Sequence, residues 1–327
     1  MKTYRIPFLL FLLASGWLIM LSSCKERNDV YPPLNWSEYK YSTSAIVPRT
    51  ISAMYYENDH SAWLGSRSNE GLLHFDGYKW NVLDKANTGI DFDSVTAITR
   101  DGNGNLWVGW KGGLASFNSS SWQRISSFDG LNVTSVVIEG IGNIKAGIKG
   151  ESGGIAIRQN DSWIFYTPSN SAIPSGNVNA MSSDHEQALW LATTDKGIIR
   201  LKENKWEVMS TGIPLLSLDF SCITTAPDGS TWAGSAASQL IHFHDDTYTV
   251  LNTGTLKPIT SVVIADDGSI WCSTLGAGMI RFDGINWTSF TMDNASLPTN
   301  DILTLAKGIP GNLLFSVPGG KVYMINQ

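Results

Sequence analysis

The stretch that decides the fold runs from Asp101 to Trp122 and reads DGNGNLWVGWKGGLASFNSSSW. It begins with a turn rich in Gly and Asn, continues with a short strand around Trp107, and reaches a second strand through a Gly-rich loop. Variants of this stretch recur along the chain at a period of about 40 residues, which predicts a β-propeller or a solenoid.

Seven units align on the position of Trp107, and small residues occupy two further columns of the alignment. Small residues are needed where the inner strands of neighbouring units crowd together, because larger side chains would overpack there. The anchor column contains Trp63, Trp107, Lys145, Trp190, Trp232, Trp271 and Leu314. The small residue two positions later is Gly65, Gly109, Gly147, Ala192, Gly234, Ser273 or Ser316, and the one ten positions earlier is Ala53, Ala97, Ser135, Ala180, Cys222, Ser261 or Thr304.

A second aromatic column opens the fourth strand of each unit but has only six members, Trp80, Trp122, Trp163, Trp206, Tyr248 and Trp287. The missing member is found near the other end of the chain, where Trp36 begins a segment that parallels the one at Trp163. We therefore predict that residues 35–41 supply the outer strand of the last unit and close a ring, which removes exposed sheet edges. The predicted fold is an all-β, seven-bladed propeller of four-stranded antiparallel blades over residues 35–327.

The composition agrees with an all-β chain and excludes one class of partner. The 327 residues include 31 Gly and 13 Trp, and only 16% are charged, which suits many short strands joined by tight turns. The formal charge is −6, and the chain has no basic block that could neutralise phosphates, so we expect no nucleic-acid binding. We also expect no cofactor.

The first residues have the pattern of an export signal. Lys2 and Arg5 precede a mostly apolar run, and Leu21-Ser22-Ser23-Cys24 resembles a bacterial lipobox. We expect residues 1–23 to be a lipoprotein signal peptide, Cys24 to carry the lipid, and residues 24–34 to form a polar tether. The alternative is a transmembrane anchor. The expected location is the cell envelope, with the outer membrane favoured, and the expected state is a monomer held to the membrane by its lipid.

Two further cysteines, Cys222 and Cys272, remain in the propeller region. An exported chain could pair them, but they fall at different places within different units. Because disulfide geometry tolerates little mismatch, we expect two buried free thiols instead.

The unit D-G-x-G-x-L-W-x-G, followed by G-L, F and W, resembles the two-component regulator propeller repeat over about residues 35–327. The resemblance implies the propeller fold and a sensor role, since such repeats form periplasmic sensors of hybrid histidine kinases that detect glycan fragments. Lys145 and Leu314 depart from the anchor Trp. Those kinases also continue into a membrane helix and catalytic modules, so the resemblance favours an exported propeller over a complete kinase.

Candidate catalytic and metal-binding residues are few. His242 and His244 alternate on a predicted strand and could form a metal pair, although an exposed strand rich in polar residues explains them equally well. The segment 101–105 spaces oxygens like part of a calcium loop but lacks the bidentate Glu, which favours an ordinary turn. We therefore expect no catalytic residue and no metal site, and keep a lyase or glycan-active enzyme as the alternative.

The loops at one mouth of the propeller channel are the expected place for a ligand. Trp110 lies outside both aromatic columns and stands beside charged residues, as in sites that stack sugar rings or bind proteins. The alternative is an extra packing aromatic between two blades. The predicted ligand-binding set for a glycan fragment or an envelope protein is Arg67, Trp110, Lys111, Lys149, Glu151 and Asp195.

Overall fold

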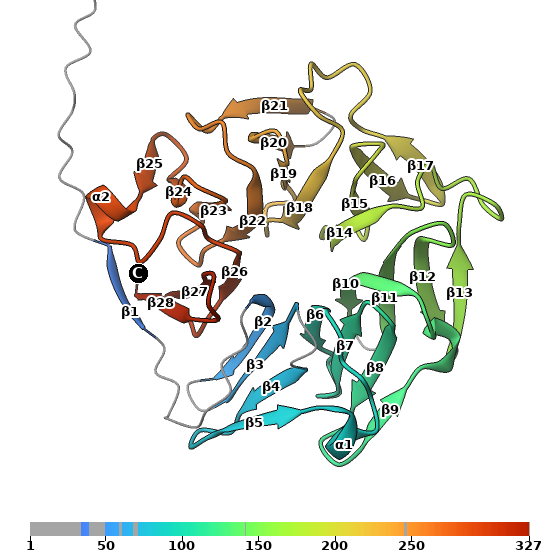
Figure 1. Ribbon diagram of the computed structural model, residues 1–327. Coiled ribbons are helices and arrows are strands. Elements are labelled where there is room, and N and C mark those ends of the chain that lie inside the picture. Colours follow the sequence, from blue (N-terminus) through green and yellow to red (C-terminus); the bar gives the residue numbers. More distant parts are fainter. Residues whose placement is uncertain are drawn as a thin grey trace, which may run out of the picture. The chain divides into compact units, whose positions relative to one another are not determined.

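The computed structural model describes residues 34–38, 50–58, 61–67, 71–140, 142–244 and 247–326. These residues form seven four-stranded antiparallel sheets, which are arranged as blades in a ring (Figure 1). The unit that contains all seven sheets spans Leu34–Gln327. The predicted seven-bladed propeller is confirmed.

In blades 1 to 6 the strand order follows the chain, from the inner strand to the outer one. Blade 1 contains β2 (Ile51–Asn58), β3 (Ser61–Ser66), β4 (Leu72–Phe75) and β5 (Trp80–Leu83), and blade 2 contains β6 (Val95–Arg100), β7 (Leu106–Trp110), β8 (Gly113–Phe117) and β9 (Trp122–Arg124). Blade 3 contains β10 (Asn132–Glu139), β11 (Asn143–Lys149), β12 (Gly154–Gln159) and β13 (Ser162–Tyr166), and blade 4 contains β14 (Val178–Ser183), β15 (Leu189–Thr193), β16 (Ile198–Lys202) and β17 (Lys205–Val208). Blade 5 contains β18 (Phe220–Thr225), β19 (Thr231–Ser235), β20 (Gln239–His244) and β21 (Thr247–Asn252), and blade 6 contains β22 (Ile259–Ile264), β23 (Ile270–Thr274), β24 (Met279–Phe282) and β25 (Trp287–Phe290).

Blade 7 joins the two ends of the propeller. It contains β26 (Thr304–Lys307), β27 (Asn312–Ser316) and β28 (Val322–Asn326), and its outer strand is β1 (Asn35–Glu38), drawn in blue beside the red strands in Figure 1. The indole of Trp36 donates a hydrogen bond to the carbonyl of Ala295 (3.1 Å) and packs edge-on against Tyr323. Ring closure is confirmed for residues 35–38, and residues 39–41 of the predicted segment lie outside the described residues.

The short helices all lie in loops between blades. They are α1 (Lys85–Thr88), the 3-10 helix η1 (Ser126–Phe128) and α2 (Met292–Ala295). Among the described residues, no helix has the length and apolar character needed to cross a bilayer.

The two small columns lie directly opposite each other on the first and second strands of every blade, as the pair Ala97 and Gly109 illustrates. A Cβ atom added to Gly109 would lie 2.7 Å from Cγ1 of Val133 in the next blade, and one added to Gly234 would lie 2.6 Å from Cγ2 of Ile259. The predicted crowding between inner strands is therefore confirmed.

A closed ring of hydrogen bonds links each blade to the next. In blades 1 to 6 the pairing of the first two strands shifts register at the second or third residue of the inner strand. A polar side chain at this bulge donates a hydrogen bond to a carbonyl at or near the start of the next inner strand. The donors and acceptors are Ser52 Oγ to Val95 O, Thr96 Oγ1 to Val133 O, Thr134 Oγ1 to Val178 O, Asn179 Nδ2 to Phe220 O, Ser221 Oγ to Ile259 O, Thr260 Oγ1 to Ile302 O and Ser316 Oγ to Ile51 O.

The departure from Trp at Lys145 is accommodated by an ion pair. Lys145 is buried, and its Nζ donates to Oε1 of Glu139, whose other oxygen accepts from Asn143 Nδ2 at 2.8 Å. A buried charge requires such compensation, because an unpaired ammonium would be strongly destabilising.

Cys222 and Cys272 are both buried and free, so the prediction of unpaired thiols is confirmed. Burial raises the pKa of the Cys222 thiol to about 11, which keeps it protonated and unreactive at neutral pH.

Candidate functional site

The mouth face is the end of the propeller that carries the loops between the second and third strands of each blade. Lys149 lies at the end of β11 on this face, and its Nζ donates to Oδ1 of Asn179 in β14 at 2.8 Å. The amide nitrogen of Asn179 donates in turn to Oδ1 of Asp219, just before β18, at 3.2 Å. A cation, an amide and a carboxylate from three successive blades are thus joined at the rim of the channel.

The other charged residues predicted for the mouth lie on the same loops. Arg67, Lys111, Glu151 and Asp195 are exposed. Asp195 accepts a hydrogen bond from Ser175 Oγ at 2.5 Å, and the carbonyl of Arg67 accepts one from Ser94 Oγ at 2.7 Å. Among the described residues, no hydrogen bond or ion pair joins two of the predicted six side chains. These side chains therefore do not form one preassembled cluster, and their role in binding stays a prediction.

The exposed aromatic residue that we predicted at Trp110 is instead buried, with only 3% of its surface accessible. Its ring packs edge-on against Phe92 at 5.3 Å and lies against Gly112 and Gly113, where a Cβ atom on Gly112 would approach the indole nitrogen to 2.7 Å. The glycines that follow Trp110 in sequence let the loop pass close to the indole. The alternative of a packing aromatic between blades is the one that the structure shows.

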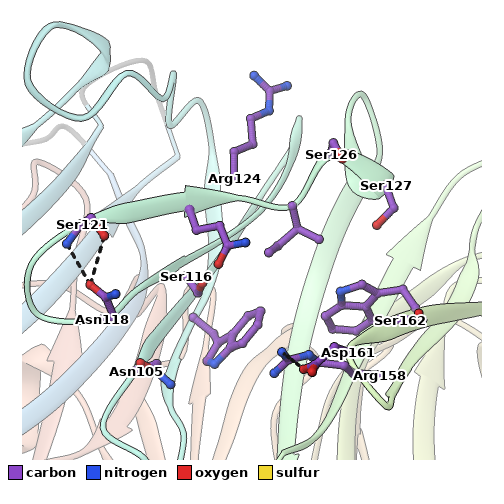
Figure 2. Close-up of a pocket in the computed structure, with 14 residues that line it drawn as sticks. Asn105, Ser116, Asn118, Ser121, Arg124, Ser126, Ser127, Arg158, Asp161 and Ser162 are labelled. Carbon is purple, nitrogen blue, oxygen red and sulfur yellow. Dashed lines mark hydrogen bonds and ion pairs between the residues drawn. The ribbon is translucent and has the colours of Figure 1, made fainter.

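A cleft of about 750 Å³ opens at the side of the propeller, between blades 2 and 3 (Figure 2). Its walls include Trp107, Ser116 and Gln123 from blade 2 and Arg158 and Trp163 from blade 3. The indole rings of Trp107 and Trp163 meet edge to face at 6.1 Å. None of the six residues predicted for the mouth lines this cleft.

The third-strand residue beside Trp107 is smaller than its counterparts in the other blades. In each blade the anchor residue pairs with a third-strand residue, which is His74, Ser116, Ile157, Arg200, His242, Arg281 or Met324. His74 stacks on Trp63 at 4.0 Å, and the guanidinium of Arg200 lies 5.4 Å from the ring centre of Trp190. In blade 2 the corresponding residue is the much smaller Ser116, which leaves more room beside Trp107 than a ring or a guanidinium would.

The arginine beside Trp107 comes from the neighbouring blade. The guanidinium of Arg158 lies 5.6 Å from the centre of the Trp107 ring and donates to Oδ1 of Asp161 at 2.6 Å. The Trp107 indole nitrogen also donates a hydrogen bond to Oδ2 of Asp101, in the turn between β6 and β7, at 3.0 Å. Burial would raise the pKa of Asp101, but hydrogen bonds from Trp107 and from Asn105 outweigh it, and the pKa is lowered.

Two of the third-strand histidines pack against the anchor tryptophans. His242 stacks on Trp232 at 4.1 Å, as His74 does on Trp63. Burial lowers the pKa of both imidazoles, so both are neutral at pH 7. Within the part of the chain that the structure describes, no group of three His, Cys, Asp or Glu side chains is placed to hold a metal ion.

Two further pockets lie away from the mouth residues. One of about 610 Å³ lies between blades 1 and 2 and is lined by Trp63, His74 and Arg100. The other, of about 550 Å³, is lined by Thr225, Val263 and neighbouring residues near the far ends of inner strands. The sequence did not predict these pockets or the blade 2–3 cleft, because all of them depend on how side chains pack between blades.

Comparison with known proteins agrees with the repeat analysis. Residues 89–109 match the sequence profile of the two component regulator propeller, so the chain carries this repeat and the resemblance inferred from its motifs is confirmed. A search of curated protein sequences gives no match.

Solved structures share the fold at low sequence identity. The extracellular domain assigned to the hybrid two component system BT3049 of B. thetaiotaomicron is 18% identical, with a TM-score of 0.73 over 90% of this chain and 41% of that one. This chain therefore spans about two fifths of the length of that sensor domain.

Two other structures of similar length show the same fold. Virginiamycin B lyase from Staphylococcus aureus, in a catalytically inactive variant with quinupristin, is 11% identical, with a TM-score of 0.73 over 90% of this chain and 99% of that one. YCF48 from Cyanidioschyzon merolae is 12% identical, with a TM-score of 0.66 over 89% of this chain and 98% of that one. Identities this low establish the propeller architecture and assign no activity to this chain.

Proposed function

We propose that this chain is an exported, lipid-anchored propeller of the cell envelope that binds a ligand on its mouth face in a sensing role, without catalysis. The observation that carries the proposal is the polar connection of Lys149, Asn179 and Asp219 across three blades at the channel rim. The similarity in fold to extracellular sensor domains supports an exported sensing role.

The chemistry of the mouth suits a polar ligand with several hydrogen-bonding groups. Lys149 and Asp195 each hold one hydrogen bond to a neighbouring blade residue or loop, and Arg67, Lys111 and Glu151 are exposed around them. Cations and anions in alternation can bind the hydroxyl groups of a glycan fragment or the mixed charges of an envelope protein. In this proposal the buried Trp110 supports the loop that carries Lys111 and does not contact the ligand.

Two substitutions at the mouth test the proposal. We expect Lys149→Met combined with Asp195→Asn to abolish binding on a glycan array or in pull-down from envelope extracts. Lys79→Met, at an exposed turn on the outer edge of blade 1, is the matched control and should leave binding unchanged. The proposal fails if the doubly substituted protein is folded and its binding on the glycan array and in the pull-down is the same as that of the wild type.

The lipid anchor and the monomeric state need separate tests. Cys24 lies outside the described residues, and its acylation is proposed from the lipobox alone. Metabolic labelling with an alkyne fatty acid should label the wild-type chain and not Cys24→Ser. Light scattering of the purified chain should give the mass of one copy, because β1 covers the edge of β28 and the outer strands of the blades are short.

A further inference from the structure

We propose that the blade 2–3 cleft is a second binding site, separate from the mouth, and that its ligand is a saccharide of two or three rings. The volume of about 750 Å³ falls within the range of about 300–1,000 Å³ typical of small-molecule sites. The cleft differs from the other seams in having Ser116 where blades 1, 4, 5 and 6 have a ring or a guanidinium beside the anchor Trp.

The polar groups of the cleft are available to a ligand. Among the described residues, no hydrogen bond uses the side chains of Ser116, Gln123, Ser126 or Ser127, although all four line the cleft. Figure 2 shows Ser126 and Ser127 near the cleft from the end of blade 2, and Arg158 and Asp161 on the blade 3 side. These uncharged donors and acceptors, from blade 2 and the 3-10 helix that follows it, match the hydroxyl groups of a sugar.

The ion pair in the cleft can rearrange toward a ligand at small cost. The side chain of Arg158 is 28% exposed and that of Asp161 is 90% exposed, and pairs of this kind contribute about 0–1 kcal/mol. Arg158 can therefore turn a donor, and Asp161 an acceptor, toward ring hydroxyls. The partly buried indole of Trp163 supplies an apolar surface for the C–H face of a sugar ring.

The lining excludes other ligand classes. Two arginines and one aspartate are its charged residues, which gives neither the carboxylate cluster that a divalent cation requires nor the extended basic surface that nucleic acid requires. Most of the side chains that line it are polar, so a lipid chain would bury hydroxyl and amide groups without partners.

The test narrows the cleft beside Trp107 without disturbing the blade. Ser116→His introduces the residue that stacks on the anchor Trp in blades 1 and 5, so the variant should fold with an unchanged melting temperature. Ser289→His makes the same chemical change at an exposed position of β25 and is the matched control. We expect the purified wild-type chain to bind members of an array of neutral and acidic di- and trisaccharides. In calorimetry of the best binder, Ser116→His should weaken affinity at least tenfold, Arg158→Met should weaken it severalfold, and Ser289→His should leave it unchanged.

Two outcomes would overturn the proposal: no array member binds, or folded Ser116→His retains affinity within twofold of wild type. The mouth variants separate this site from the proposed function. If Lys149→Met with Asp195→Asn removes saccharide binding and Ser116→His does not, the cleft proposal fails and the mouth proposal stands. If Ser116→His removes saccharide binding and Lys149→Met with Asp195→Asn does not, the cleft is the saccharide site and the mouth does not bind a glycan.

Discussion

Removing the indole of Trp36 should destabilise the whole propeller, because this residue fixes the strand that closes the ring. Burying an aromatic side chain removes roughly 150–250 Å² from water, worth about 4–6 kcal/mol at about 25 cal/mol per Å². Trp36 keeps part of its surface exposed, so about half of that range applies, and its hydrogen bond to Ala295 adds about 1 kcal/mol. The expected loss for Trp36→Ala is about 3–4 kcal/mol of unfolding free energy.

Urea unfolding followed by circular dichroism measures this loss, and light scattering detects association through the freed edge of β28. Trp36→Phe keeps a ring against Tyr323 but has no donor for the Ala295 carbonyl, so it should lose only about 1–2 kcal/mol. If Trp36→Ala unfolds within about 0.5 kcal/mol of wild type and stays monomeric, β1 does not hold the ring closed and the closure argument is refuted.

Three further predictions follow from the blades themselves. Gly109→Ala should cost about 1–3 kcal/mol, since its new methyl would lie 2.7 Å from Val133 Cγ1. Combining it with Val133→Ala should cost less than the sum of the two single changes in urea unfolding, and simple additivity would contradict the steric explanation. Asp101→Ala removes the acceptor for Asn103 N, Asn105 N and Trp107 Nε1 and should lower the unfolding free energy by about 2–3 kcal/mol. Asp101→Asn should lose an intermediate amount. Equal melting temperatures for the wild type and both variants would argue against the turn as a stabilising element. Burial lowers the pKa of His74 and of His242, so the unfolded chain binds protons at a higher pH than the folded chain does, and stability should fall as the pH drops below about 7 toward 5. The variant His74→Phe with His242→Phe should show a smaller decrease over the same range, and an identical decrease would show that these imidazoles are not its source.

The blade architecture could be predicted from the sequence because the same physical demand recurs in every unit. Crowded inner strands require small residues such as Gly109, and sheets packed on one another require an aromatic anchor such as Trp107. The closing strand could be predicted because one aromatic column lacked a member and Trp36 supplied it. These signals are local and repeat seven times, so a single departure such as Lys145 did not hide them.

The site residues could be predicted only in part. A tryptophan among charged residues can face solvent or pack inward, and Trp110 packs inward because Gly112 and Gly113 let the loop pass beside its ring. The blade 2–3 cleft was missed because it depends on how the side chains of two neighbouring blades pack against each other. Once the register is known, Ser116 is visible as the smallest member of its column.

The hydrogen bond from Ser316 to the carbonyl of Ile51 joins residues 265 positions apart. Bringing such distant segments together costs roughly 5 kcal/mol of chain entropy, and this cost is met only after the final strands have been made. Until those strands are made, the flank of blade 1 that faces blade 7 has no partner to cover it. Removing β28 would take away the partner of both β27 and β1 and the contacts of Val322 with blade 1 and of Tyr323 with blade 6, which makes this strand as sensitive to deletion as any buried core strand.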